Sequence, residues 1–348
     1  MILKNICTGL SILLFLAASG CAVYTTPRDG HFSLPFWGIA VDGYPLTGER
    51  LRKIEKETGL PSHLVVFFLQ WPALTDKGVA NFPEETLDAI WNTGAIPCLT
   101  WEPMYYVNGQ ENMVPYETIV SGSYDSYILE FARRARLWEG PFMIRFAHEM
   151  NIDRYHWGTE KTSYGPESPE IYKQMFRHVA SLFRKAGAKN VLWVFCPNAE
   201  SVPNVSHDPR ALWNRVANYY PGDEYADILG IDGYNWGTSQ TKEKHGWNSR
   251  WQSFEEIFKS VYGELRTLAP HKPVIIFETA SVTQGGDKTL WIKEAFETLK
   301  KWQIRGIVWF HVLKDADWRI QSGINSDYAK IIRRDIFTSE EWLRGYVK

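Results

Sequence analysis

The segment Arg145-Phe146-Ala147-His148-Glu149-Met150-Asn151 decides the fold class, because it joins a cluster of ionisable side chains to an apolar run. The preceding run, Pro141-Phe142-Met143-Ile144, has the length and composition of a buried strand of a parallel sheet. Parallel α/β sheets place their chemistry at the carboxyl ends of such strands. We therefore expect Glu149 and His148 to belong to a functional site. The alternative is a structural ion pair of Glu149 beside a core histidine.

A second segment of the same design lies far along the chain, at Lys272-Pro273-Val274-Ile275-Ile276-Phe277-Glu278-Thr279. It is again a short apolar run that ends in a glutamate. Hydrolysis of a glycosidic bond requires two carboxylic groups, one as proton donor and one as nucleophile or base. The pair Glu149 and Glu278 therefore predicts a carbohydrate-active site.

Six further apolar runs, most of them rich in Val, Ile and aromatic residues, complete a set of eight predicted strands. They alternate with helical patterns, which predicts right-handed parallel crossovers. Eight such units in roughly 300 residues fit a single-domain (β/α)8 TIM barrel, in which the strand ends that carry Glu149 and Glu278 converge across the mouth. The predicted strands are 36–41, 64–71, 95–101, 142–148, 191–197, 228–234, 274–279 and 306–311.

The stretches between these strands carry helix signals, such as a cap at Thr47 and a stop at Gly59. A doubly wound open sheet is the alternative architecture. No Gly-x-Gly-x-x-Gly follows an early strand, and polar residues end most strands instead of one switch point, which disfavours it. The predicted helices are 47–58, 83–92, 124–138, 169–185, 249–268 and 287–302, and the fifth crossover offers only 210–218.

Charge and composition narrow the class of partner. The net charge of -2 and the absence of basic runs argue against nucleic acid. The 16 tryptophans and 17 tyrosines are suggestive of sugar binding, although large cores also use aromatic residues. No Cys-x-x-Cys or His-Glu-x-x-His sequence occurs, so we expect neither a metal nor a cofactor. Cys98 and Cys196 lie on non-adjacent predicted strands, which favours two buried free thiols.

The first twenty residues form a predicted signal peptide, with Lys4 as its positive start and an apolar stretch at 10–18. Ala18-Ser19-Gly20 before Cys21 resembles a bacterial lipoprotein signal, in which the cysteine is lipidated; an ordinary secretory signal is the alternative. Residues 21–35 then form a lipidated N-terminus and tether, and 36–348 the catalytic domain. The absence of an acidic residue directly after Cys21 resembles lipoproteins of the Gram-negative outer membrane. We expect a monomer anchored at the cell envelope, on its periplasmic or surface face.

Four motifs accompany the two glutamates in order along the chain: His148-Glu149-Met150-Asn151, Tyr155-His156-Trp157-Gly158, Gly230-Ile231-Asp232-Gly233-Tyr234-Asn235 and Trp309-Phe310. With these motifs, the chain from about Trp37 to Phe337 resembles glycoside hydrolase family 26. The resemblance implies a retaining endo-acting hydrolase of β-linked plant polysaccharides, chiefly β-1,4-mannan, with mixed-linkage β-1,3-1,4-glucanases and β-1,3-xylanases as smaller groups. It implies Glu149 as the general acid/base, which donates the proton, and Glu278 as the nucleophile.

Four further residues are predicted to support this pair. The resemblance implies that Tyr234 hydrogen-bonds the nucleophile; the alternative is a core aromatic. His148 is predicted to position the acid/base or to bind a sugar hydroxyl. Arg145 shares the inward parity of Glu149, so it is either a buried counter-charge under the site or the partner of another barrel carboxylate. Asp232 either binds a sugar hydroxyl or is structural.

Aromatic residues near the strand ends are candidate sugar platforms. Trp157 and Trp309 are the leading candidates, and Trp101, Trp236 and Tyr105 are weaker ones because any of them can pack the barrel rim.

Two departures from the family pattern put sugar binding beside the catalytic pair in doubt: Ile152 replaces a glycine and Arg154 a tryptophan. The sequence segments around Glu149 and Asp232 resemble the glucanase branch of the family more than the mannanases. The expected partner is therefore a β-linked polysaccharide or oligosaccharide, glucan or mannan. The alternatives are a β-1,3-xylanase, a trimming or transglycosylating enzyme of an endogenous exopolysaccharide, and a surface lipoprotein that binds glycans without turnover.

Overall fold

The computed structural model describes residues 35–76, 81–158, 165–320 and 327–335, which belong to one compact unit, His31–Lys348. The predicted signal peptide, the lipidation site Cys21 and all of the predicted tether except position 35 lie outside the described residues. Within the described part of the chain, no helix combines the length and the apolar character needed to cross a bilayer.

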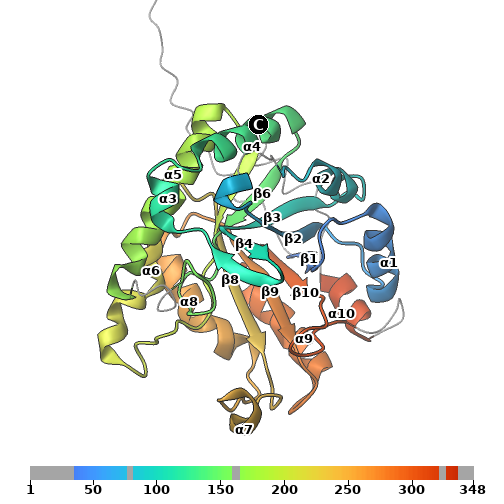
Figure 1. The fold of residues 1–348 in the computed structure, drawn as a ribbon. Coiled ribbons are helices and arrows are strands. Elements are labelled where there is room, and N and C mark those ends of the chain that lie inside the picture. Colours follow the sequence, from blue (N-terminus) through green and yellow to red (C-terminus); the bar gives the residue numbers. More distant parts are fainter. Residues whose placement is uncertain (1–34, 77–80, 159–164, 321–326, 336–348) are drawn as a thin grey trace, which may run out of the picture. The chain divides into compact units, whose positions relative to one another are not determined.

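The strands β1, β10, β9, β8, β7, β6, β3 and β2 close into a barrel in that order, and every neighbouring pair is parallel (Figure 1). This confirms the TIM barrel and excludes the doubly wound open sheet. The eight predicted strands agree with the observed ones to within a residue or two at each end. Their bounds are β1 Phe36–Ala40, β2 Leu64–Gln70, β3 Ile96–Glu102, β6 Phe142–Phe146, β7 Val191–Phe195, β8 Ile228–Asn235, β9 Val274–Ser281 and β10 Gly306–Phe310.

Helices connect the strands around the barrel, and most begin and end where the sequence predicts. The predicted helix 249–268 starts later, because the Ser253 hydroxyl and the Glu256 side chain form a capping box. The fifth crossover contains only 3-10 and short α-helical turns. The helices are α1 Gly48–Thr58, α2 Glu84–Trp91, α3 Tyr116–Val120, α4 Asp125–Trp138, α5 Ser168–Ala186, α6 Val216–Tyr219, α7 Lys242–His245, α8 Phe254–Leu268, α9 Lys288–Lys301 and α10 Asp327–Asp335, with 3-10 turns η1 Leu74–Asp76, η2 Gly165–Glu167 and η3 Pro209–Asn214.

An antiparallel hairpin after β3 was not predicted. It pairs β4 (Met104–Val107) with β5 (Gln110–Met113). Asn108 and Gly109 both have positive φ, 51° and 76°, as a two-residue Asn-Gly hairpin turn requires. The Asn-Gly signal is therefore present in the sequence, but the flanking residues lack the apolar alternation of a buried strand.

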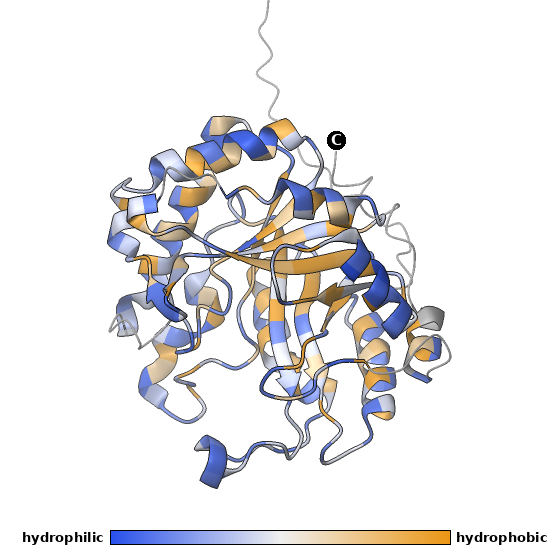
Figure 2. Cartoon of the chain, turned by 45° about the vertical axis from the view of Figure 1, so that its right-hand side comes forward, coloured by the Kyte–Doolittle hydropathy of each residue, from blue (hydrophilic) through white to orange (hydrophobic). Residues whose placement is uncertain are grey.

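Two apolar layers hold the barrel together. The larger one lies between the outward faces of the strands and the helices, and Figure 2 shows apolar strands surrounded by helices with hydrophilic outer faces. The smaller one fills the barrel interior from alternate strand positions, including Met143, Val194, Ile228 and Ile275. Gly230 belongs to this interior, where an added Cβ would lie 2.6 Å from Cys196 Sγ. Cys98 and Cys196 are buried free thiols, as predicted.

A bulge in β9 determines which way Glu278 points. Asp232 pairs with Glu278, although the neighbouring pair in β8 is Ile231 with Ile276, so β9 has one extra residue. Regular alternation would put Phe277 inside the barrel and Glu278 outside. Phe277 does point inward, and the bulge turns Glu278 inward as well; a bulge that re-aims a side chain in this way is common beside active sites.

Candidate active site

Glu149 follows β6 on a backbone held in an unusual conformation. Ala147 and Glu149 both have positive φ, 47° and 52°, which costs a non-glycine residue about 1–3 kcal/mol each. The surrounding strands compensate: the Ala147 amide donates to the Trp101 carbonyl at 3.1 Å, and the Glu149 amide donates to the Cys196 carbonyl at 2.8 Å. The strained turn therefore presents the Glu149 carboxyl group at the barrel mouth.

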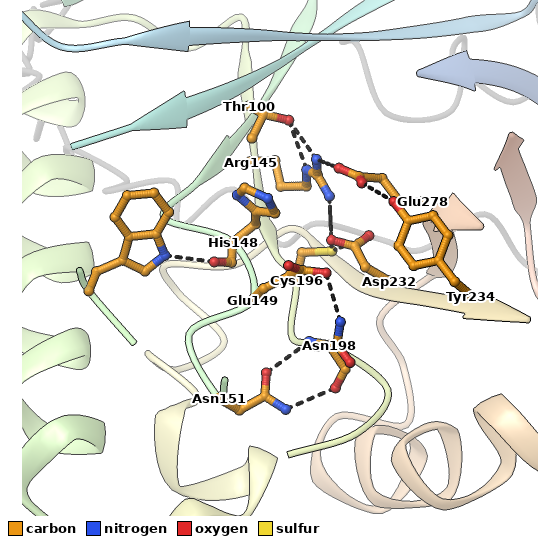
Figure 3. Close-up of polar contacts among 11 residues, drawn as sticks. Thr100, Arg145, His148, Glu149, Asn151, Cys196, Asn198, Asp232, Tyr234 and Glu278 are labelled. Atoms are coloured by element: carbon orange, nitrogen blue, oxygen red, sulfur yellow. Dashed lines mark hydrogen bonds and ion pairs between the residues drawn. The ribbon is translucent and has the colours of Figure 1, made fainter. Parts of the chain in front are cut away.

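Asn198 holds the carboxyl group of Glu149 in place. Its Nδ2 donates to Glu149 Oε1 at 2.7 Å. Asn151 fixes Asn198 in turn, because its side chain accepts from the Asn198 amide at 2.8 Å and donates to the Asn198 carbonyl at 2.9 Å (Figure 3). Sequence analysis missed Asn198, although it is the first polar residue beyond the predicted strand 191–197.

The pKa of Glu149 is raised to about 7, first by burial and then by the negative charge of Glu278. The bond from Asn198 and the more distant charge of Arg145 oppose this shift. Glu149 is therefore substantially protonated near neutral pH, which is the state that a general acid needs.

Glu278 has the opposite surroundings. Arg145 forms an ion pair with its Oε1, and the Tyr234 hydroxyl donates to its Oε2 at 2.5 Å. Both carboxyl oxygens thus accept from donors, one of them a fixed positive charge, and this arrangement suits an ionised carboxylate. The contact that the family resemblance implies for Tyr234 is present.

Arg145 and Asp232 lie beneath Glu278 without solvent-exposed surface (Figure 3). Arg145 Nη1 lies 2.5 Å from Asp232 Oδ2, and its Nε and Nη2 donate to Thr100 Oγ1 at 3.0 and 2.7 Å. Protein atoms surround both side chains, so neither is placed to bind substrate, and of the two roles expected for Asp232 the structure favours the structural one. Arg145 fills both of its predicted roles. It is the counter-charge to Glu278, and it pairs with a second barrel carboxylate, Asp232.

His148 is buried beside this cluster. Burial and the positive charge of Arg145 hold its pKa well below the ordinary value, so the ring is neutral. Among the described residues, nothing hydrogen-bonds its Nδ1. Its carbonyl accepts from the Trp157 indole nitrogen at 2.7 Å, which fixes the backbone next to Glu149.

The two leading tryptophan platforms are not available to a sugar. Trp309 is 1% exposed, stacks on Trp37 at 6.3 Å and donates its indole N–H to the Trp318 carbonyl at 2.7 Å. Trp157 is also buried, and Tyr155 stacks on it at 4.6 Å. The prediction of platforms at Trp309 and Trp157 is therefore wrong. Trp309 alternates outward along β10, toward the helices, and Trp157 supports the backbone of His148.

Trp101, one of the weaker candidates, is fully buried as well, whereas Trp236 and Tyr105 keep part of their surface in contact with solvent.

A third carboxyl group, Glu102 at the end of β3, was also missed. It is buried, and Gln70 Nε2 donates to its Oε2 at 2.5 Å. Burial raises the pKa of Glu102 to about 7, and the charges of Arg145 and Glu278 act on it. Side chains alternate along β3, so Glu102 lies on the same inward face as Thr100. This alternation could have identified Glu102 from the sequence.

His148, Asp232 and Glu278 each offer a potential metal ligand, and these atoms lie within 4.8 Å of one another. Arg145 already bonds both carboxylates of this set. Its guanidinium supplies the positive charge that a cation would bring, so a metal would have to displace a buried arginine.

The two departures from the family pattern lie at the edge of the site. Arg154 forms two 3.1 Å hydrogen bonds to the two carboxyl oxygens of Glu111 in β5, and His156 Nε2 lies 3.1 Å from the same carboxylate. The arginine that stands in place of a tryptophan therefore fastens the β4–β5 hairpin to the segment after Glu149.

Comparison with solved structures gives the same architecture. A β-mannanase of glycoside hydrolase family 26 from Bacteroides ovatus superposes with a TM-score of 0.60 over 89% of this chain and 90% of that one. A mannanase from Bacillus subtilis gives a TM-score of 0.57 over 88% and 86%. Both are 18% identical in sequence, so they bear on the fold alone.

Sequence comparison finds similarity over parts of the chain. The Endoglucanase H of Acetivibrio thermocellus is 38% identical over 237 residues, which is 68% of this chain and 24% of that protein. A mannan endo-1,4-beta-mannosidase of Bacillus subtilis is 30% identical over 98 residues, or 27% and 23%. The chain thus spans about a quarter of the length of these curated relatives. Residues 91–261, which include Glu149 and Asn198, match the model of glycosyl hydrolase family 26.

Proposed function

We propose that this protein is a retaining, endo-acting β-glycoside hydrolase of a β-linked polysaccharide, with Glu149 as acid/base and Glu278 as nucleophile. The observation that carries the proposal is the asymmetry of the two carboxyl groups. Burial and a like charge keep a proton on Glu149, whereas Arg145 and Tyr234 direct donors at both oxygens of Glu278. Such a divergence of environments separates an acid from a nucleophile.

The reaction follows a double displacement. A Glu278 oxygen attacks the anomeric carbon while Glu149 gives its proton to the leaving glycosidic oxygen, so that one C–O bond forms as the other breaks. In the second step, Glu149 takes a proton from water, and the resulting hydroxide oxygen displaces Glu278 from the sugar. Asn198 stabilises Glu149 between the two steps, because its side-chain amide donates a hydrogen bond to the ionised carboxylate that exists there.

The ring of His148 is neutral, and its Nδ1 is buried without a hydrogen-bond partner among the described residues. His148 is 1% exposed, so the burial that argues against Trp309 and Trp157 as sugar platforms also argues against this ring as a sugar contact. Of its two predicted roles, this favours positioning of the acid/base, through the backbone that Trp157 fixes next to Glu149.

A β-glucan is the favoured substrate, and β-1,4-mannan the second candidate. The relative with the longer and more similar match is named an endoglucanase, and the shorter match is to a mannosidase. The polymer is expected to be cleaved internally, as both names indicate.

The test is the release of reducing sugar by the full-length protein from mixed-linkage β-glucan, glucomannan, galactomannan and β-1,3-xylan. We expect release from the glucan, and its loss in Glu278→Ala. Glu294→Ala serves as the control, because Glu294 is exposed on the outer helix α9 and makes no contribution to the site. A folded wild type that releases nothing but binds a glycan equally well with and without Glu278 would support the glycan-binding lipoprotein instead.

We further propose that the protein is a lipoprotein anchored through Cys21, with the polysaccharide as its other partner. The support is the apolar stretch at 10–18 followed by Ala18-Ser19-Gly20-Cys21. Incorporation of radiolabelled palmitate should occur in the wild type and be absent in Cys21→Ala. Equal labelling of the two proteins would exclude lipidation at this cysteine.

A further inference from the structure

Trp247 is an unusually exposed tryptophan on the side of the barrel that carries the site. It lies just after α7, in the segment between β8 and α8, and 46% of its surface is exposed. This segment follows the carboxyl end of β8, so it leaves the barrel on the face that carries Tyr234 and Glu278. Figure 1 shows α7 below β8, at the bottom of the view. A single exposed apolar ring is common on protein surfaces, so its contacts with other rings decide whether it is a candidate binding surface.

A series of rings connects Trp247 with the nucleophile. Trp247 contacts Trp236 at 5.9 Å, and Trp236 contacts Trp318 at 4.7 Å. Trp318 in turn packs on Tyr234 at 5.0 Å, and the Tyr234 hydroxyl bonds Glu278. Trp318 is buried in this series, Tyr234 and Trp236 on either side of it are half-buried, and the outermost ring, Trp247, is exposed. Packed aromatic rings therefore link the tyrosine that bonds Glu278 to the exposed ring of Trp247.

The contact with Trp236 leaves Trp247 accessible. The two ring planes meet at 80°, an edge-to-face arrangement. Whichever ring presents its edge, such a contact covers at most one face of Trp247. The other face is available to a flat, apolar partner such as the C–H face of a pyranose ring.

Backbone hydrogen bonds on both sides of Trp247 fix its loop before any ligand arrives. The Lys242 amide donates to Asn248 Oδ1 at 2.8 Å, and the Gln240 amide donates to Ser249 Oγ at 3.0 Å. The Ser249 amide returns a bond to the Gln240 carbonyl at 3.1 Å. A loop ordered in advance costs less entropy when it binds.

We propose that Trp247 is the platform of a distal subsite, which binds a pyranose residue of the same β-linked glycan, away from the bond that is cleaved. The proposal rests on the proposed function for the identity of the glycan. Long chains reach Trp247 and the catalytic pair together, and short oligosaccharides bound at the pair do not.

Trp91 is a matched control within the same chain. It is 42% exposed and meets Trp138 edge to face at 6.0 Å and 82°. It is the last residue of α2, which precedes β3, so it lies toward the amino ends of the strands. Figure 1 shows α2 at the upper right, well away from α7.

The experiment is affinity electrophoresis of the full-length protein in detergent, in native gels that contain mixed-linkage β-glucan or glucomannan. All variants carry Glu278→Ala, so that the glycan stays intact. We expect Trp247→Ala to weaken binding roughly twofold to tenfold, the range of one aromatic contact. Trp247→Phe should retain part of the binding, and Trp91→Ala should match the parent. In the catalytically intact protein, Trp247→Ala should raise KM for the polymer more than KM for a trisaccharide.

Equal retardation of Trp247→Ala and its parent would overturn the proposal, as would equal weakening by Trp91→Ala. The two proposals fail separately. A wild type that releases no reducing sugar, while its retardation still depends on Trp247, would refute the hydrolase and leave the platform in place.

Discussion

Glu149 and Glu278 are the same residue type at the ends of parallel strands and both are buried, yet their hydrogen-bond partners and neighbouring charges differ. Glu149 sits on a strained turn, is buried, and has one neutral amide as its hydrogen-bond partner. Glu278 sits at a bulge and receives a guanidinium and a phenol hydroxyl. The difference teaches that the partners, not the residue type, assign the two roles.

Removing each carboxyl group in turn should separate the two roles most strongly. Glu149→Ala should lower kcat on polysaccharide by about 10²–10⁴-fold, the usual contribution of a general acid. Its first-turnover release of dinitrophenol from a dinitrophenyl β-cellobioside should fall far less, because that leaving group needs no proton. Glu278→Ala should abolish both reactions. Equal losses on the two substrates in Glu149→Ala would contradict its role as the acid.

The ion pairs on the two sides of the site should differ in their contribution to stability. Arg145→Met leaves Asp232 and Glu278 buried without their counter-charge and should lower the free energy of unfolding by about 3–5 kcal/mol. Arg154→Met breaks an exposed pair with Glu111 and should cost about 0–1 kcal/mol. Urea denaturation of both variants measures the difference. Similar costs would show that the buried cluster does not depend on its arginine.

Tyr234→Phe removes one donor from Glu278 and keeps the ring. A hydrogen bond to a charged group contributes about 1.5–3 kcal/mol, so kcat should fall roughly tenfold to a hundredfold if the bond acts in the transition state. Tyr220→Phe is the matched control, because its hydroxyl donates to Asp223 at 2.7 Å on the protein surface. An unchanged kcat in Tyr234→Phe would assign the tyrosine to packing.

The smallest expected effect is a shift in the pH profile of activity. This shift should identify the group that acts as the acid. Burial and Glu278 raise the pKa of Glu149 to about 7, so kcat/KM should decline above that pH as Glu149 loses its proton. Asn198 opposes this shift, and Asn198→Ala should therefore raise the pKa further and move the alkaline limb upward.

Glu102 provides the control for this profile, because its pKa is also about 7. Gln70 holds that pKa down through its hydrogen bond, so Gln70→Leu should raise the pKa of Glu102. An alkaline limb that follows Gln70→Leu and ignores Asn198→Ala would make Glu102 the titrating group.

Much of the barrel could be predicted, because its strands are continuous apolar runs that end at Pro, Gly or Asn. The bulge in β9 could not, since Phe277 and Glu278 carry no local mark that reverses their alternation. The partner of Glu149 was missed for a related reason: Asn198 lies 49 residues away in sequence, and only the adjacency of β6 and β7 brings it to the carboxyl group.

The tryptophans show the limit of composition as a guide. Trp309 and Trp157 stand next to catalytic motifs in sequence, yet both rings are buried. Trp247 stands in a polar segment without any motif, yet 46% of its surface is exposed. Nearness in sequence to a strand end does not tell which side of the strand a ring occupies.

The sequence by itself determined the eight parallel strands and the two glutamates at their ends, because apolar periodicity and residue type are local properties. The tertiary structure alone decided which neighbour each glutamate meets. Arg145 reaches the pair from β6, Tyr234 from β8 and Asn198 from the segment after β7. An acid and a nucleophile differ through those long-range contacts, and no local pattern encodes them.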